Sequence, residues 1–236
     1  STGNTWKNDV LLELPADVQA SPRKGQNVIA AHCHNTTGGA HVDFGLSVKM
    51  PDAMFFETAA DQTHVTFTPT QTYYTFACGP VALKVIFTAP LLMDDLDLMS
   101  RPVNYISYQV ESADGKAHDV QLYLEATSAW ATNVPGQAVE SAVILKPEGL
   151  QYAMTGTVDQ PVLQTKGDDV RIDWGHFYLA APQKESVTFG ASDFMSLKKE
   201  FAAAGSISRG RNIDDPNQEH SLAMVDNLGS VKDAAS

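Results

Sequence analysis

The sequence predicts an all-β fold, an antiparallel β-sandwich with one short helix near Phe194–Ala204. Three observations lead to this prediction. Apolar and polar residues alternate with period 2 along much of the chain after His41, which is the pattern of half-buried strands. About a dozen such segments follow one another at intervals of about 8–12 residues, as in large antiparallel sandwiches. A helical period is found in one segment, close to residue 200.

The clearest element is the stretch Arg101–Asn133, which has the pattern of a β-hairpin. Apolar and polar residues alternate from Ile106 to Val110 and again from Val120 to Leu124. Between these two arms stands Asp114-Gly115, a strong hairpin signal because glycine adopts a positive φ without a Cβ clash. The sequence therefore predicts two strands paired with each other.

The other strands are assigned in chain order from the same alternation and from the prolines that end them. Before the hairpin, the predicted strands are 42–48, 63–68, 72–76 and 81–87, the last two paired across 78–80. After it, they are 139–145 paired with 150–155, 162–164, 170–180, 186–191 and 222–225. Residues 206–221 are predicted as a loop and 226–229 as a final turn. We expect short strands and loops in residues 1–60 and the sandwich in residues 61–236.

The helix is predicted from a change of period after the strand 186–191. Its apolar positions are Phe194, Leu197 and Phe201, spaced i, i+3 and i+7. Ser192 or Asp193 is the expected N-cap, because both side chains accept hydrogen bonds from the first turn. Gly205 is the expected end, since glycine adopts the left-handed conformation that follows many helices.

Composition indicates a well-packed acidic protein. The chain has 236 residues, 43% of them hydrophobic, and a formal net charge of -12 from 16 basic and 28 acidic residues. Nucleic acids and anionic membranes attract basic surfaces, so this charge argues against both as partners. No stretch approaches ~20 apolar residues, so we expect no membrane insertion. We find no signal peptide, and both ends look like cuts in a longer protein.

Three histidines and a cysteine fall within residues 32–41. In an extended segment His32 and His34 share a face, as two ligands of one metal require, and His41 follows closely. The spacing fits no zinc finger, and no carboxylate stands beside these residues, so ordinary loop histidines are the alternative. We assign no metal and no cofactor, and keep His32, His34 and His41 as the residues to examine for a metal.

No catalytic motif is present: the sequence lacks a serine nucleophile elbow, a phosphate-binding glycine loop and a metalloprotease helix. The cluster Asp94–Asp97 lacks the glycine and distal glutamate of a calcium loop and is read as a solvated acidic turn. The acidic pairs 168–169 and 214–215 fit turns. Cys33 and Cys78 form one disulfide or remain two buried thiols.

Several ordered motifs resemble the β-sandwich domain of the glutaminase A family. They are LLMDDLDLMSRPVNYISYQVESADGKAHDVQLYLEATSAWATN at 91–133, GDDVRIDWGHFY at 167–178 and LAMVDNLGSV at 222–231. The resemblance covers roughly residues 63–232, and its specificity comes from the joint, ordered recurrence of the motifs. It implies a sandwich of the supersandwich, galactose-mutarotase-like type in secreted, periplasmic or cell-surface proteins of fungi and Bacteroidetes.

The resemblance also implies a multidomain hydrolase. In such proteins the sandwich precedes a C-terminal (α/α)6 domain of the six-hairpin glycosidase type, and the whole protein converts L-glutamine and water to L-glutamate and ammonia. The helical domain has no counterpart after Gly205, so we expect this chain to be an inactive scaffold or docking partner for it. No catalytic residue of the family is carried over onto a position of this sequence.

Five residues are the candidates for a binding or interface site: Trp130, Arg171, Asp173, Trp174 and His176. If buried, the tryptophans are core residues; if exposed, they stack on a sugar or anchor a neighbouring domain. Two alternative functions follow from the residues. One is a carbohydrate-binding or glycoside-hydrolase-associated β-sandwich module, and the other is a metal hydrolase that uses His32, His34 and His41.

Overall fold

A computed structural model describes the fold in residues 58–134, 136–146, 149–164, 172–213 and 219–235, and at isolated positions 14, 15, 18, 55, 56 and 166. The chain divides into two compact units, residues 1–51 and 52–236, and the elements named below belong to the second. The predicted strand 42–48, Cys33 and the three histidines at 32, 34 and 41 lie outside the described residues.

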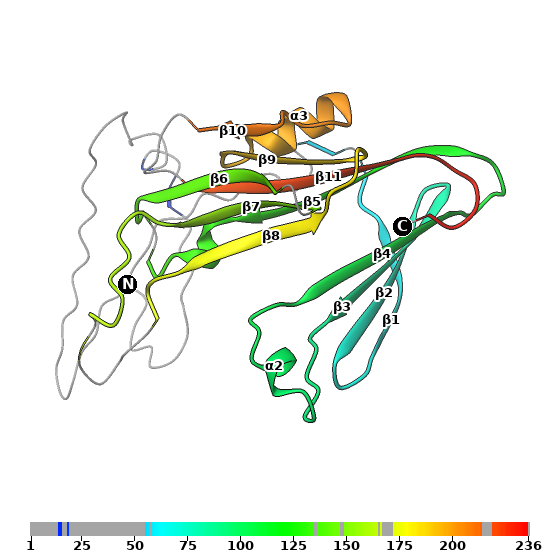
Figure 1. The fold of residues 1–236 in the computed structure, drawn as a ribbon. Helices are drawn as coiled ribbons and strands as arrows, with labels where there is room; N and C mark the ends of the chain where they lie inside the picture. The colour runs from blue at the N-terminus through cyan, green and yellow to red at the C-terminus, as the bar shows by residue number, and fades with distance from the viewer. Residues whose placement is uncertain are drawn as a thin grey trace. The chain divides into compact units, whose positions relative to one another are not determined.

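Strands dominate the described part of the chain (Figure 1). The elements are β1 (Asp61–Phe67), β2 (Gln71–Cys78), β3 (Val81–Thr88), α2 (Leu96–Met99), β4 (Tyr105–Ser112), β5 (His118–Thr127), the 3-10 helix η1 (Ser128–Ala131), β6 (Val139–Lys146), β7 (Leu150–Thr157), β8 (His176–Pro182), β9 (Val187–Asp193), α3 (Ser196–Ala204), β10 (Gly210–Asn212) and β11 (His220–Val231). Among the described residues, no helix is long and apolar enough to cross a membrane.

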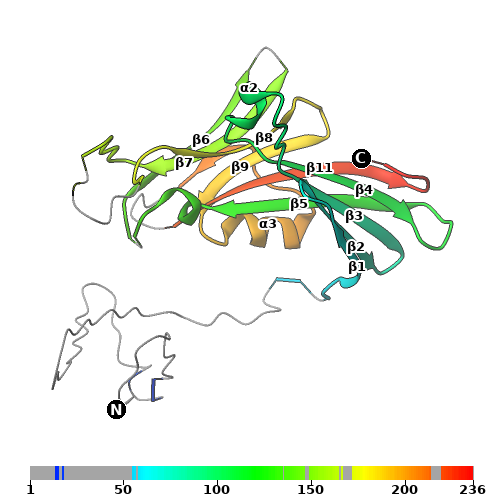
Figure 2. The same cartoon turned by 90° about the horizontal axis from the view of Figure 1, so that it is seen from below.

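The strands form three sheets (Figures 1 and 2). Their strand orders are β1-β2-β3-β4, β10-β9-β11-β5 and β6-β7-β8. All neighbours are antiparallel except β10 and β9, which are parallel. The second and third sheets pack face to face, and this confirms the predicted all-β sandwich.

The core lies between these two sheets and continues beneath α3. Phe189 of β9 and Leu222 of β11 are almost completely buried and face the side chains of β7 and β8. The intervening residues of β11, such as Ala223, point to the opposite face, where Leu197 and Phe201 of α3 cover them. Because both faces of β11 are covered, this strand reads as a continuous apolar run near Leu222, as buried central strands do.

The hairpin predicted at Arg101–Asn133 is wrong, although both of its strands exist. β4 pairs along its whole length with β3, whereas β5 pairs with β11, about a hundred residues further along the chain. After Val231 the chain turns back, and Ala235 bridges to Val110 of β4. Partners distant in sequence therefore occupy the strand edges that a local hairpin would have used. Gly115 does adopt the positive φ expected of it, +73°.

Four other expectations need correction. Residues 162–164, predicted as a strand, form a turn that follows Pro161, and residues 172–175 have no regular structure before β8 begins. Residues 226–229, predicted as a turn, continue β11 through a bulge between Asn227 and Gly229. The loop predicted at 206–221 contains the short strand β10 and the first residues of β11. In each case the local conformation depends on whether the segment pairs with a strand that is distant in the sequence.

The predicted helix exists as α3, but its N-terminal cap differs. Ser192 and Asp193 belong to β9, where they pair with Ser221 and His220 of β11, so neither caps the helix. Met195 holds the cap position with a φ of +73°. Gly205 ends the helix as predicted, and its N–H donates to the Phe201 carbonyl. The acidic turn at 94–97 contains the short helix α2, capped by the Asp95 carboxylate.

One hydrogen bond ties the first sheet to the second. The Tyr108 hydroxyl of β4 donates to Oδ2 of Asp226 on β11 at 2.5 Å, and Asp226 is only 1% exposed. Burial and the neighbouring carboxylate raise the pKa of Tyr108, so its hydroxyl keeps the proton it donates. We therefore expect Tyr108→Phe to lower the free energy of unfolding by about 1.5–3 kcal/mol, the range for bonds to charged groups.

Urea denaturation of the variant measures this loss. Tyr105→Phe on the same strand is the matched control, because Tyr105 is largely exposed and should tolerate the change. Equal midpoints for the two variants would show that the bond to Asp226 contributes nothing.

The turn between β4 and β5 supplies a pH prediction. His118 donates to Asp114 at 2.8 Å and the Lys116 N–H donates to the same oxygen, which together lower the pKa of Asp114 to about 2 from its ordinary 3.8. The carboxylate contribution to stability is therefore complete above pH 4 and is lost as the pH falls toward 2. NMR titration of the carboxyl carbon, identified by its absence in Asp114→Asn, should give a midpoint near 2; an ordinary midpoint would contradict the hydrogen bonding.

Candidate functional site

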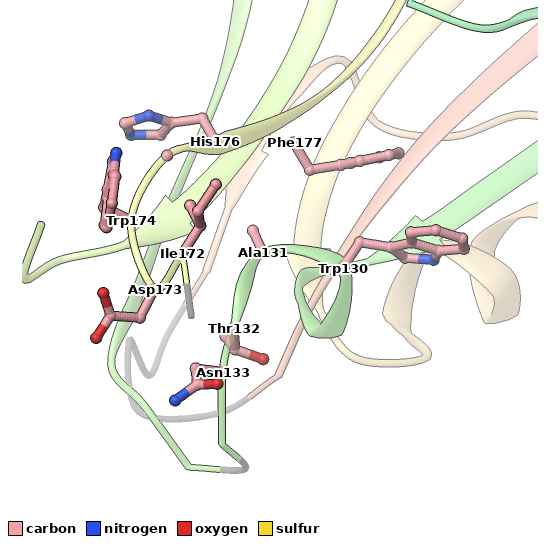
Figure 3. Close-up of a pocket in the computed structure, with 10 residues that line it drawn as sticks. Trp130, Ala131, Thr132, Asn133, Ile172, Asp173, Trp174, His176 and Phe177 are labelled. Atoms are coloured by element: carbon pink, nitrogen blue, oxygen red, sulfur yellow. The ribbon is translucent and has the colours of Figure 1, made fainter. Parts of the chain in front are cut away.

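A shallow cleft lies where η1, the loop before β8 and the start of β8 meet. Its volume is about 280 Å³. It is lined by Trp130, Ala131, Thr132, Asn133, Ile172, Asp173, Trp174, Gly175, His176 and Phe177. Figure 3 shows Trp130 and Phe177 on one side and Trp174 and His176 on the other, with Ala131 and Ile172 between them. We call this the aromatic cleft.

Aromatic rings give the cleft its character. Trp130 is 75% exposed, which is unusual because tryptophan side chains are on average highly buried. Its ring stacks on Phe177, with 5.9 Å between centroids and 28° between planes. The stack fixes the indole on one side and leaves the rest of it open to solvent. Trp130 is therefore not a core residue, which answers the question left open by the sequence.

The loop that carries Asp173 and Trp174 is held in place by Gln160. The Gly175 N–H donates to Oε1 of Gln160 at 2.6 Å, and the Gln160 amide donates back to the Gly175 carbonyl. Gly175 itself has a φ of +106°, a conformation that side chains disfavour. This bidentate contact explains how a segment without regular structure can present fixed side chains to the cleft.

Two neighbours of His176 are Gly156, on the adjacent strand β7, and the Glu140 carboxylate. It pairs across strands with Gly156 of β7, where an added Cβ would lie 2.5 Å from its ring and 2.8 Å from the Gly175 carbonyl. Glycine at 156 therefore makes room for the imidazole. Nε2 of His176 lies 3.8 Å from the Glu140 carboxylate, so protonation of His176 would create an ion pair at the rim.

The cleft brings together four of the five predicted site residues: Trp130, Asp173, Trp174 and His176. The fifth, Arg171, lies outside the described residues, as do His32, His34 and His41. Sequence reasoning missed Phe177, Asn133, Gln160 and Gly156. Phe177 directly follows His176 and Asn133 closes the motif that begins at residue 91, so proximity to those residues was the available signal. Nothing local marks Gln160 or Gly156.

A second surface feature is the apolar face of the β1–β4 sheet. Directly paired residues of antiparallel strands share a face, and two cross-strand rows are largely apolar. One row is Val65, Tyr74, Val85 and Tyr108, and the other is Phe67, Thr72, Phe87 and Ile106. The opposite face carries polar residues such as Thr75, Lys84 and Gln109. We call the first of these the apolar sheet face.

The apolar sheet face is buried at one end and open at the other. Tyr108 and Val110 reach the core, whereas Phe67 is 79% exposed and Phe87 46%. The segment joining β3 to β4 leaves from this open end and exposes further apolar side chains. These are Leu91, Leu92, Met93, Leu96, Met99 and Val103. Contiguous apolar surface of this kind marks a site of interaction with another part of a protein or with a partner.

Two further groups with reactive side chains are the Ser141–His220 pair and Cys78. Oγ of Ser141 lies 2.8 Å from Nδ1 of His220, but both residues are almost completely buried and Thr155 completes the network. Cys78 is a free thiol, and burial raises its pKa, which disfavours the nucleophilic thiolate. Among the described residues, no cluster of histidine, cysteine and carboxylate side chains could hold a metal ion.

A second cavity, of about 360 Å³, lies beside the end of β6. It is lined by Leu145, Gln151, Gln183, Lys184, Glu185 and Arg209. It contains no aromatic ring, and its charged side chains belong to exposed surface segments, so it offers fewer fixed groups than the aromatic cleft.

Comparison with known proteins gives two matches. The family described as "Domain of unknown function (DUF5127)" matches residues 70–236. Glutaminase A of Aspergillus oryzae is 28% identical over 182 residues, which cover 74% of this chain and 26% of that protein. The chain thus spans about a quarter of the length of this curated relative. No solved structure matches the chain.

Proposed function

Since the chain belongs to the DUF5127 family, we propose that it is the non-catalytic β-sandwich domain of a glutaminase-like hydrolase. Its role is to act as scaffold and docking partner for the remainder of that protein. The observation that carries the proposal is the apolar sheet face, together with the relative's length. About three quarters of the Aspergillus glutaminase A lies outside the matched region, so a large partner for this face is available in such a protein.

The size of the exposed surface favours docking. Phe67, Phe87 and Ile106 lie in one cross-strand row, and aromatic side chains bury roughly 150–250 Å² each when covered. Together with the exposed apolar residues of the β3–β4 segment, this approaches the area of a domain interface within one chain, roughly 600–1,500 Å². An uncovered surface of this extent is costly in water and invites aggregation.

The burial of the Ser141–His220 pair supports a non-catalytic role for these two residues. The Ser141 hydroxyl donates to Oγ1 of Thr155, and the His220 backbone N–H donates to Oγ of Ser128, so the Ser141–His220 pair belongs to a buried structural network. Hydrolysis of an amide needs a nucleophile or activated water that the substrate can reach, and this buried pair is out of reach of a substrate.

The finer parts of the proposal rest on the motif resemblance. They are that the parent converts L-glutamine to L-glutamate and ammonia, that the sandwich stands N-terminal to an (α/α)6 domain, that the protein is of the fungal or Bacteroidetes type, and that it is secreted, periplasmic or on the cell surface. The acidic surface, with a net charge of -12, is compatible with the expectation that neither nucleic acid nor membrane is the partner.

Ammonia release tests the non-catalytic role. Purified residues 1–236, incubated with L-glutamine and followed by a coupled glutamate dehydrogenase assay, should release no more ammonia than the buffer. A longer protein that contains this domain, assayed in parallel, should release it. Turnover by residues 1–236 alone, retained through a second purification step, would overturn the proposal.

A further inference from the structure

The aromatic cleft is a second feature that the proposed docking role does not use. The apolar sheet face lies on β1–β4, whereas the cleft is built from η1, the loop 172–175 and β8. Trp130 is fixed by its stack on Phe177, and the loop 172–175 is fixed by Gln160, so the cleft exists before any ligand arrives. Preformed concave sites with a few fixed polar groups are typical of small-molecule binding.

The lining residues fit a ligand that has one flat apolar face and hydrogen-bonding groups around its edge. Trp130 offers an open indole face, and Trp174 lies on the other side of the cleft (Figure 3). Such rings pack against the flat apolar side of a ligand. Asn133 and His176 supply hydrogen-bonding groups at the cleft edge, which suit a ligand with hydroxyl groups at its rim. A sugar ring has both surfaces, with C–H groups on one face and hydroxyls around the edge.

The charge of the lining residues favours a neutral ligand over an anionic one. The described lining residues include the carboxylate of Asp173 but no lysine or arginine, and the chain carries a net charge of -12. Phosphates and free carboxylates require cationic or N–H donors to replace their water shell. A neutral hydroxylated ligand meets no such cost. An amino acid such as glutamine would bring its own carboxylate to a lining that has no lysine or arginine among its described residues.

Volume sets the length of the ligand. The cleft measures about 280 Å³, close to the lower end of the roughly 300–1,000 Å³ found for ligand sites. It therefore accommodates one sugar residue, with further residues in solvent. We propose that the aromatic cleft binds a single residue of a neutral oligosaccharide, stacked on Trp130 and hydrogen-bonded through Asn133 and His176.

Titration of residues 1–236 with maltotriose, cellotriose, mannotriose and xylotriose tests this inference, with L-glutamine as a fifth probe. The readout is the pair of indole N–H resonances of Trp130 and Trp174. At least one trisaccharide should shift both, with a dissociation constant of about 1 mM, and glutamine should shift neither. Absence of a shift with all four trisaccharides, or a shift with glutamine alone, would overturn the inference.

Substitutions locate the site. Trp130→Ala should weaken binding about tenfold, because the stacking ring is lost. The variant should fold normally, since Trp130 is exposed on the surface. Phe67→Ala is the matched control, an exposed aromatic residue on the apolar sheet face, and should leave sugar binding unchanged. Binding that survives Trp130→Ala would overturn the inference, whereas the docking role is tested on β1–β4 and stands or falls separately.

Discussion

Replacing Phe67 and Phe87 by serine should reduce both self-association and hydrophobic-dye binding of residues 1–236. The two side chains lie in one cross-strand row at the open end of the apolar sheet face. Because exposed apolar area drives both effects, we expect the fluorescence of bound anilinonaphthalene sulfonate to fall by about half. Light scattering after gel filtration should show the population shifting toward monomer.

Tyr105→Ser provides the control for this double variant. Tyr105 is 48% exposed and pairs with Thr88, so it lies on the opposite face of the same sheet. Its loss should leave dye binding and association nearly unchanged. An equal response from the control would mean that general loss of aromatic surface, rather than the apolar sheet face, drives the effect.

The second large effect is expected in the sandwich core. Phe189 of β9 is 1% exposed. It belongs to the buried core cluster that also contains Leu222 and Met224. Phe189→Ala removes a ring from a close-packed interior and leaves a cavity. We expect the free energy of unfolding to fall by about 3–5 kcal/mol, a large share of the stability of an ordinary domain.

Chemical denaturation with both fluorescence and circular dichroism measures this loss. Phe194→Ala is the matched control, because Phe194 precedes α3 and is 43% exposed, and its change should stay within about 0.5 kcal/mol. A loss below about 1 kcal/mol for Phe189→Ala would contradict the placement of β9 at the centre of the sandwich.

Local pattern predicted the strands well but not their partners. The alternation from Ile106 to Val110 and from Val120 to Leu124 located β4 and β5 correctly. The pairing of β5 with β11 and of Val110 with Ala235 joins residues about a hundred positions apart, and no local signal encodes it. Asp-Gly favours a turn, and the turn formed, but the strands leaving it belong to different sheets.

For the candidate site, too, the sequence predicted individual residues but not the contacts between distant parts of the chain. Trp130, just past the predicted hairpin, and Trp174, on a predicted strand, were predicted as site residues, and both line one cleft. Gln160 and Gly156 shape that cleft through a loop contact and a strand pairing, so their roles exist only in three dimensions. The cap of α3 was missed for the same reason, because β9 extends through the residues that would have capped it.

We expect the apolar sheet face to be covered by another domain in a longer protein that contains this sandwich. Hydroxyl-radical footprinting of Phe67, Phe87 and Met93, compared between residues 1–236 and a longer protein that contains this domain, measures that coverage directly. Met93 is 86% exposed in the present structure and should react readily in the shorter chain. We expect all three residues to be strongly protected from oxidation in the longer protein, whereas the oxidation of Tyr105 on the opposite face should be unchanged. Equal oxidation of Phe67 and Phe87 in both proteins would contradict this expectation.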